Sequence, residues 1–153
     1  MKIWFDTEFY EDGDVIELIS IGMVREDGKT YYAETKKAIK LAKKTDWLKE
    51  NVLPHLWGVH DYRSKIRSDI IEFAGENPEF WAYYGAYDWV VLCQLFGTMI
   101  NLPEGWPMFC MDVKQLAVMK GNPELPKQKS AEHNALADAV WTKEAWEFLQ
   151  KYE

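Results

Sequence analysis

The chain has 153 residues, of which 48% are apolar and 28% are charged, a composition typical of a folded domain with a sizeable core and not of a disordered chain. Its formal net charge of -7 excludes the broad basic surface of a protein that grips long duplex DNA, so a nucleic-acid partner would need metal ions or a short single-stranded end. No apolar run approaches the roughly 20 residues of a membrane helix, no signal-peptide pattern opens the chain, and the two cysteines lack metal-site spacing. We therefore expect a cytoplasmic protein with no membrane partner.

In chain order, the pattern first predicts three strands in a meander. An apolar run marks residues 2–6 as a strand, and alternating apolar residues mark residues 15–24 as the next one. Asp27-Gly28 is a hairpin-turn signal, after which residues 30–34 return as a third strand. The five lysines between residues 36 and 44 are interpreted as solvated surface.

Helices and short strands alternate in the remainder of the chain. Capping residues and apolar periodicity predict helices that begin at Thr45 or Asp46, at Ser64, at Asp88, at Asp112 and at about His133. Short apolar runs predict strands over residues 80–84 and 108–111. A meander followed by this alternation predicts an α/β fold, a mixed five-stranded sheet flanked by helices, in a single domain over residues 1–153.

Two carboxylates, Asp6 and Glu8, stand at the first predicted strand. Side chains two residues apart in a strand point to the same face, so the two negative charges would lie together. Such a pair is costly without a cation, which favours a divalent-metal site. Taken alone, the pair also fits a simpler arrangement in which Asp6 caps a turn and Glu8 faces water.

Three later residues join this pair. Asp88 follows a predicted strand, where α/β proteins build their sites, and it is equally well placed to cap the next helix. Asp138 flanks the apolar face of the last predicted helix and needs a partner unless it reaches water. His133 lies five residues earlier, and a position on the preceding loop or first turn would hang it over the same site. The other two histidines, His55 and His60, are interpreted as surface residues of a loop.

The order Asp-x-Glu, Asp, His-x-x-x-x-Asp resembles the DEDDh exonucleases, the DnaQ-like branch of the RNase H-like superfamily. The three motifs are Phe5-Asp6-Thr7-Glu8, Tyr84-Gly85-Ala86-Tyr87-Asp88 and His133-Asn134-Ala135-Leu136-Ala137-Asp138. Within that family the chain is most similar to the bacterial polyadenylate-specific 3′-exoribonucleases (RNase AS). The stretches that carry this closer resemblance are Phe5–Phe9, Glu11–Gly13, Ile16–Gly22, Tyr31–Ala33, Val52–Pro54, Gly85–Asp88 and Leu92–Leu95.

The resemblance implies a two-metal hydrolysis of phosphodiester bonds. Two divalent ions, Mg²⁺ or Mn²⁺, would be held by four carboxylates, with Asp6, Glu8 and Asp138 at one ion and Asp6 and Asp88 at the other. His133 would act as general base toward the attacking water. The product would be a nucleoside 5′-monophosphate.

The resemblance also implies how the substrate is held. Thr7, Phe9 and Tyr10 would contact the terminal nucleotides, the two aromatic rings by stacking on bases; for the rings, core packing is an equally good interpretation. One departure concerns the second strand, where the family usually has a Glu before its Ile-Gly pair and this chain has Ser20. Glu17 is then either displaced or has another role.

The expected activity is that of a 3′-to-5′ exoribonuclease acting on single-stranded RNA 3′ ends, with poly(A) as a candidate substrate. An exodeoxyribonuclease or proofreading-type enzyme of the same fold is the alternative, because the catalytic residues do not separate RNA from DNA. A non-catalytic RNA- or nucleotide-binding module is an alternative of another class. The resemblance implies a homodimer, for which Trp47, Trp57, Trp81 and Trp106 would supply an interface if they are not core residues.

Overall fold

In the computed structural model, which describes residues 1–130 and 132–152, a mixed sheet forms the centre of the molecule, with the strand order β4-β3-β2-β1-β5-β6. β1, β2 and β3 pair antiparallel, whereas β5 runs parallel to β1, β6 to β5, and β4 to β3. The strands are β1 (Lys2–Glu11), β2 (Ile16–Arg25), β3 (Thr30–Thr35), β4 (His60–Asp61), β5 (Glu79–Ala82) and β6 (Met111–Asp112).

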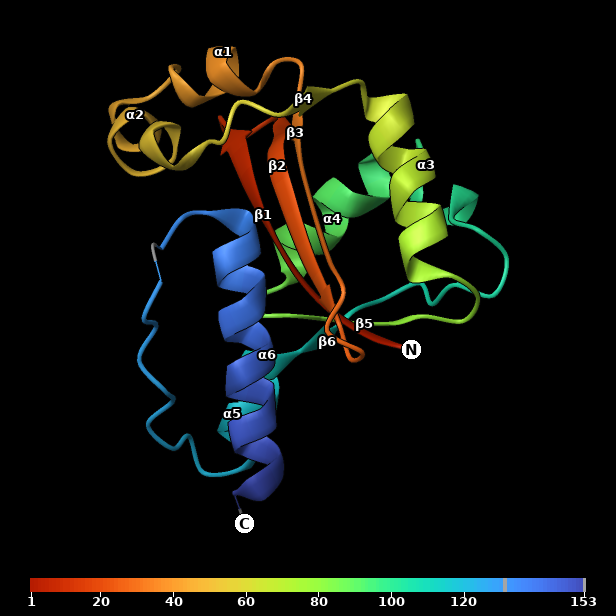
Figure 1. The fold of residues 1–153 in the computed structure, drawn as a ribbon, viewed down its shortest axis with the longest axis vertical. Helices are drawn as coiled ribbons and strands as arrows, with labels where there is room; N and C mark the ends of the chain where they lie inside the picture. Colours follow the sequence, from red (N-terminus) through yellow and green to blue (C-terminus); the bar gives the residue numbers. More distant parts are fainter. Residues whose placement is uncertain (131, 153) are drawn as a thin grey trace.

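Helices cover both faces of this sheet (Figure 1). α6 packs on one face, where its buried side chains meet Trp4 of β1, and α3 and α4 pack on the other face around Phe5. α1 and α2 cover Ile19 of β2 with a smaller cluster of their own. The helices are α1 (Ala38–Ala42), α2 (Asp46–Asn51), α3 (Arg63–Ala74), α4 (Ala86–Gln94), α5 (Val113–Met119) and α6 (Ala135–Lys151), with 3-10 turns at Leu53–His55 and Met99–Asn101. Within the described residues, none of the helices has the length and apolar character to cross a membrane.

The three-strand meander is confirmed, but the sheet has one strand more than predicted. β4 is only two residues long and pairs with Glu34 and Thr35 of β3. Backbone bonds on either side fasten it, from Glu34 N to Val59 O at 3.2 Å and from Lys36 N to Asp61 O at 3.1 Å. So short a strand has no side-chain alternation, which is why the sequence pattern does not predict it.

β1 continues to Glu11, well beyond its predicted end at residue 6. Its pairing with β2 carries on past Glu8 across a β-bulge, which lies between Glu8 and Phe9 and skips Ile19 in the register. Glu8 therefore lies within the strand, beside an irregularity of the kind that re-aims side chains near active sites.

The predicted helix caps Thr45 and Asp112 are confirmed, whereas Ser64 is not a cap. Thr45 Oγ1 accepts from Leu48 N at 3.1 Å at the start of α2, and Asp112 Oδ1 accepts from Lys114 N at 2.7 Å at the start of α5. α3, however, begins at Arg63 and not after Ser64. A helix was also missed: within the lysine run predicted as solvated surface, Ala38, Leu41 and Ala42 of α1 are buried.

The start of α6 lies unusually close to β2, at Gly22. A Cβ added to Gly22 would stand 2.2 Å from the backbone nitrogen of Leu136, so any other residue would push the helix away. Gly22 pairs with Asp6 across the β1–β2 ladder. The missing side chain therefore brings the first turn of α6 down onto the part of the sheet that carries the acidic residues.

Candidate active site

The structure brings together Glu8, His133 and Asp138, whose potential ligand atoms all lie within 4.8 Å of one another. Glu8 comes from β1, His133 from the turn before α6, and Asp138 from the first turn of that helix. Asp6 shares the Glu8 face of β1 because strand side chains alternate. A cavity of about 340 Å³ opens there, lined by Asp6, Tyr83, Gln128, Glu132, His133, Asp138, Trp141 and Thr142.

Asp88 reaches the same cluster from the other side of β1. It lies within the first turn of α4, two residues after the helix begins, so it does not cap that helix. The carboxylate is buried and its Oδ1 accepts from the backbone nitrogen of Thr7 at 2.9 Å and from Thr7 Oγ1 at 2.6 Å. Thr7 therefore fastens Asp88 to β1 between the two acidic residues of that strand.

Burial raises the pKa of all four carboxylates, and at Asp6 and Glu8 the neighbouring carboxylates raise it further. Burial, with Asp88, Glu8 and Asp138 close by, raises the pKa of Asp6 well above its ordinary value. Burial and the nearby Asp138 and Asp88 raise the pKa of Glu8 to about 8. Burial raises the pKa of Asp88 to about 6, although the bonds from Thr7 work in the opposite direction.

Asp138 carries a raised pKa for the same reason, since burial outweighs the donors that face it. Those donors are Gln128 Nε2, at 2.6 Å from Oδ1, and the backbone nitrogen of His133, at 3.0 Å from Oδ2. A group of partly or fully buried carboxylates with raised pKa values is the electrostatic environment that a divalent cation relieves.

His133 is held over this cluster by its backbone and by an aromatic neighbour. It has the left-handed backbone angle φ of 66°, which turns the chain immediately before α6. Its ring meets Trp47 of α2 edge-on, with 5.0 Å between the ring centroids. The predicted position of His133, on a turn above the acidic residues, is therefore confirmed.

The residues predicted to bind substrate do not lie together. Thr7 is buried and bound to Asp88. The ring of Phe9 lies 5.8 Å from that of Tyr87 and packs against the core on the α3 and α4 side. Tyr10 packs with the cluster under α1 and α2, beneath the ammonium group of Lys44 at 4.4 Å. Phe9 and Tyr10 are successive strand residues and point to opposite faces.

Sequence reasoning missed three residues beside the cluster: Trp47, Gln128 and Asn134. From the sequence, Trp47 is expected to be an interface or a core residue, and no pattern marks Gln128 as a site residue. Asn134 accepts from Ala137 N at 3.0 Å and so caps α6, a role that a residue of this type before an apolar helix signals.

The departure from the family pattern in the second strand has a clear location. Ser20 is buried and pairs directly with Glu8 across the ladder, so it does lie beside the cluster. Glu17 pairs with Tyr10 instead and lines a separate cavity of about 570 Å³, together with Lys36 and Arg63. Glu17 therefore does not take the place of the missing carboxylate.

The interpretation of His60 as a loop surface residue is wrong. Its Nε2 lies 3.1 Å from Oε1 of the fully buried Glu34, and only 24% of its side chain is exposed. Its neighbour along the loop, His55, is half-buried and its carbonyl accepts from Asn134 Nδ2 at 3.1 Å. The sequence pattern does not predict the burial of His60 or the hydrogen bond at His55, because Glu34 and Asn134 lie in distant parts of the chain.

The chain as a whole is similar to known exoribonucleases. The model of the 3′-5′ exoribonuclease Rv2179c-like domain matches residues 1–150. The 3′-5′ exoribonucleases Rv2179c and MT2234.1 of Mycobacterium tuberculosis, from strains H37Rv and CDC 1551, are each 41% identical to this chain over 150 residues, which is 91% of this chain and 87% of each relative.

The fold also matches solved structures of exonuclease I. One superimposes with a TM-score of 0.69 at 16% identity over 98% of this chain. Exonuclease I from Methylocaldum szegediense gives a TM-score of 0.61 at 16% identity over 97%. This chain spans only 40% and 39% of those longer chains, so the likeness concerns the RNase H-like fold. Together with the match over almost the whole length, this shows that the chain belongs to the Rv2179c-like family of 3′-5′ exoribonucleases.

Proposed function

We propose that this 3′-to-5′ exoribonuclease removes nucleoside 5′-monophosphates from single-stranded RNA 3′ ends by a two-metal mechanism in which His133 is the general base. The observation that carries the proposal is that potential ligand atoms of Glu8, His133 and Asp138 lie within 4.8 Å of one another. Asp6 lies close enough to Asp88, Glu8 and Asp138 for their negative charges to raise its pKa. A base and a set of oxygen ligands on one spot are the requirements of metal-assisted phosphodiester hydrolysis.

The donor set fits divalent cations. Carboxylate oxygens are the ligands that Mg²⁺ and Mn²⁺ prefer, and the raised pKa values of these carboxyls mark a place that a cation would stabilise. Asp6, Glu8 and Asp138 would hold one ion, and Asp6 and Asp88 the other. When bound, the ions would polarise the scissile phosphate, favour ionisation of the attacking water and stabilise the leaving 3′ oxygen.

The protein side chains have separate tasks in this proposal. His133 accepts the proton of the attacking water at a ring nitrogen, and its edge contact with Trp47 limits how far the ring can turn. Asp138 accepts from the backbone of His133 and so links the ligand set to the base. Thr7 supports Asp88 and is not a direct substrate contact.

The terminal base has a candidate site on the other side of Glu8. A cavity of about 320 Å³ lies there, lined by Glu8, Phe9, Glu11, Thr45, Trp47 and Leu48. Trp47 is 53% exposed, so its ring is available for stacking, which contributes about 1–3 kcal/mol per base. We propose that Trp47 stacks on the base, while Tyr10, beneath Lys44, is less well placed than the sequence suggested. Poly(A) remains the candidate substrate.

The proposal of a homodimer rests on the family resemblance, and only some of the tryptophans support it. Trp81 and Trp106 are buried in the core, so they are excluded as interface residues. Trp57 is 57% exposed and is therefore available for an interface, whereas Trp47 is proposed to stack on the terminal base. Light scattering on the purified protein would measure the mass of the assembly.

The test is product release from defined oligonucleotides. With Mg²⁺ or Mn²⁺ the enzyme should release AMP from oligo(A) faster than it degrades other RNA homopolymers or DNA, and EDTA should stop the reaction. Equal rates on RNA and DNA would contradict the proposed substrate. Tight binding without cleavage in either metal would instead identify a binding module.

A further inference from the structure

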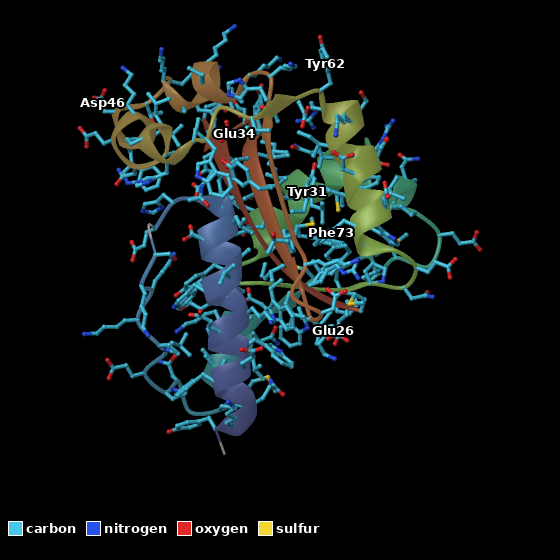
Figure 2. The ribbon with its side chains drawn as sticks, in the orientation of Figure 1. Glu26, Tyr31, Glu34, Asp46, Tyr62 and Phe73 are labelled. Atoms are coloured by element: carbon cyan, nitrogen blue, oxygen red, sulfur yellow. The ribbon has the colours of Figure 1, made fainter. Side chains whose placement is uncertain are left out.

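A buried carboxylate outside the acidic cluster organises the loop next to it. Glu34 of β3 has no exposed surface and lies near the end of its strand, beneath the segment that carries α1 and α2 (Figure 2). It accepts from the backbone nitrogens of Trp57 at 2.5 Å and Gly58 at 3.0 Å, and also from the hydroxyl of Tyr32. These three hydrogen bonds compensate for the burial of the carboxylate. His60 Nε2 lies 3.1 Å from Glu34 Oε1 but makes no hydrogen bond to it.

The loop held by Glu34 is also hydrogen-bonded to the start of α6. The backbone of Glu34 also binds Val59 O, at 3.2 Å, so residues 57–60 are fixed to β3 through both main chain and side chain. At residue 55 the same segment is bound again, because His55 O accepts from Asn134 Nδ2 at 3.1 Å. Asn134 is 79 residues further along the chain and only 5% exposed.

Asn134 stands between the loop and the acidic site. Its Oδ1 accepts from Ala137 N at 3.0 Å, and its backbone carbonyl accepts from Asp138 N at 2.9 Å. The next residue toward the N-terminus is His133, whose backbone nitrogen binds Asp138 Oδ2. A displacement of Asn134 would therefore move the base and a ligand together.

We infer that Glu34 and Asn134 are positioning residues for the reaction, joined through residues 55–60 into one clamp that fixes His133 over Glu8 and Asp138. Neither side chain belongs to the acidic cluster. The clamp rests on the proposed role of His133 as base, and the left-handed backbone of that residue gives it a specific task. A non-glycine residue keeps such a backbone only where the surroundings hold it.

The first test is Asn134→Ser. Serine is a good helix cap, so α6 keeps its start, but the amide donor to His55 O is lost. The clamp predicts a kcat lower by about 10- to 100-fold, because small misplacements of catalytic groups have effects of that order. It also predicts an almost unchanged KM, because the proposed substrate contacts remain. An unchanged kcat would overturn the inference.

A double variant shows whether Asn134 acts through His133. If it does, adding Asn134→Ser to His133→Ala should lower kcat no further than His133→Ala alone. Multiplied losses would mean that Asn134 acts independently, which contradicts the clamp. Full activity of His133→Ala alone would instead refute the proposed base, so failures of the two ideas are distinguishable.

The tyrosines of β3 provide a matched pair if Asn134→Ser does not fold. Tyr32 and Tyr31 are adjacent and point to opposite faces; Tyr32 donates to Glu34, whereas Tyr31 donates to Asp69 at 3.3 Å. Figure 2 shows Tyr31 beside Phe73 of α3, and the alternation of β3 places Tyr31 on the opposite face from Tyr32 and Glu34. Tyr32→Phe should lower kcat with KM retained, and Tyr31→Phe should not. Equal effects of the two changes would overturn the inference.

Discussion

At the scale of single residues, the site is a balance between repelling carboxylates and the groups that hold them in place. Asp88 illustrates this, because Thr7 donates two hydrogen bonds to one of its oxygens while burial opposes its ionisation. Side chains that the fold keeps together at such a cost to their charged forms are candidates for function.

Replacing Asp88 by Asn should separate catalysis from folding. The amide oxygen of Asn can still accept from Thr7, whereas the negative charge of the proposed ligand is lost. We expect cleavage to fall by at least about 100-fold while the metal-free protein is as stable as the wild type or more so. Cleavage assays and thermal unfolding measure the two effects. Full activity of this variant would refute the ligand assignment.

The raised pKa of Glu8 predicts how stability depends on pH in the absence of metal. The folded carboxyl holds its proton up to about pH 8, whereas the unfolded one releases it near its ordinary pKa of 4.5. The contribution to stability is therefore complete below about pH 4.5 and is lost as the pH rises through 8. Glu8→Gln should consequently gain stability relative to the wild type over this range. Thermal unfolding of both proteins in EDTA tests this; a constant difference would contradict it.

His133 has two possible roles that one variant distinguishes. As a general base it contributes to the rate, typically by 10²- to 10⁴-fold, without being needed to hold the ions. We expect His133→Ala to lose rate while calorimetry still shows Mn²⁺ binding of similar affinity. A large loss of Mn²⁺ affinity would make His133 a ligand, since its ring lies among the potential ligand atoms.

At the scale of elements, the site depends on how closely α6 approaches β2. Gly22→Ala places a methyl group against the backbone of Leu136 and should cost about 1–3 kcal/mol of unfolding free energy or more. Because the helix carries Asp138, the folded variant should also lose activity. Ile21→Val, on the other face of β2, is the control: it costs about 0.5–1.5 kcal/mol and should leave activity intact. Equal activity of the two folded variants would contradict this account.

Most elements could be predicted where the sequence has a local signal, either apolar periodicity or a helix-capping residue. The meander follows from alternation and the Asp27-Gly28 turn, and Thr45 and Asp112 are caps that act within three residues of themselves. β4 was not predicted, and β6 lies at Met111–Asp112 instead of residues 108–111. Both strands have only two residues and are stabilised by distant backbone partners, which a local pattern does not reveal. The role of Asn134 as a link to His55 could not be predicted for the same reason.

At the scale of the whole molecule, the negative net charge is consistent with a metal-dependent site for a polyanionic substrate. A chain of net charge -7 would repel RNA, and part of that negative charge is concentrated in the cluster where, in the proposed mechanism, the scissile phosphate binds. Divalent ions would reverse the local sign and allow a polyanion to approach. The proposed site residues could be selected from the sequence because their order and spacing resemble the DEDDh motifs. The positions of Trp47 and of the loop at Glu34 could not, because they depend on contacts between distant parts of the chain.

The most direct test of the two-metal site is a crystal structure grown with Mn²⁺ and AMP, in which anomalous scattering locates the metal. The account predicts two Mn²⁺ peaks roughly 3.5–4 Å apart among Asp6, Glu8, Asp88 and Asp138, with His133 facing the phosphate. Metal bound elsewhere, or no peak within the acidic cluster at saturating Mn²⁺, would contradict it.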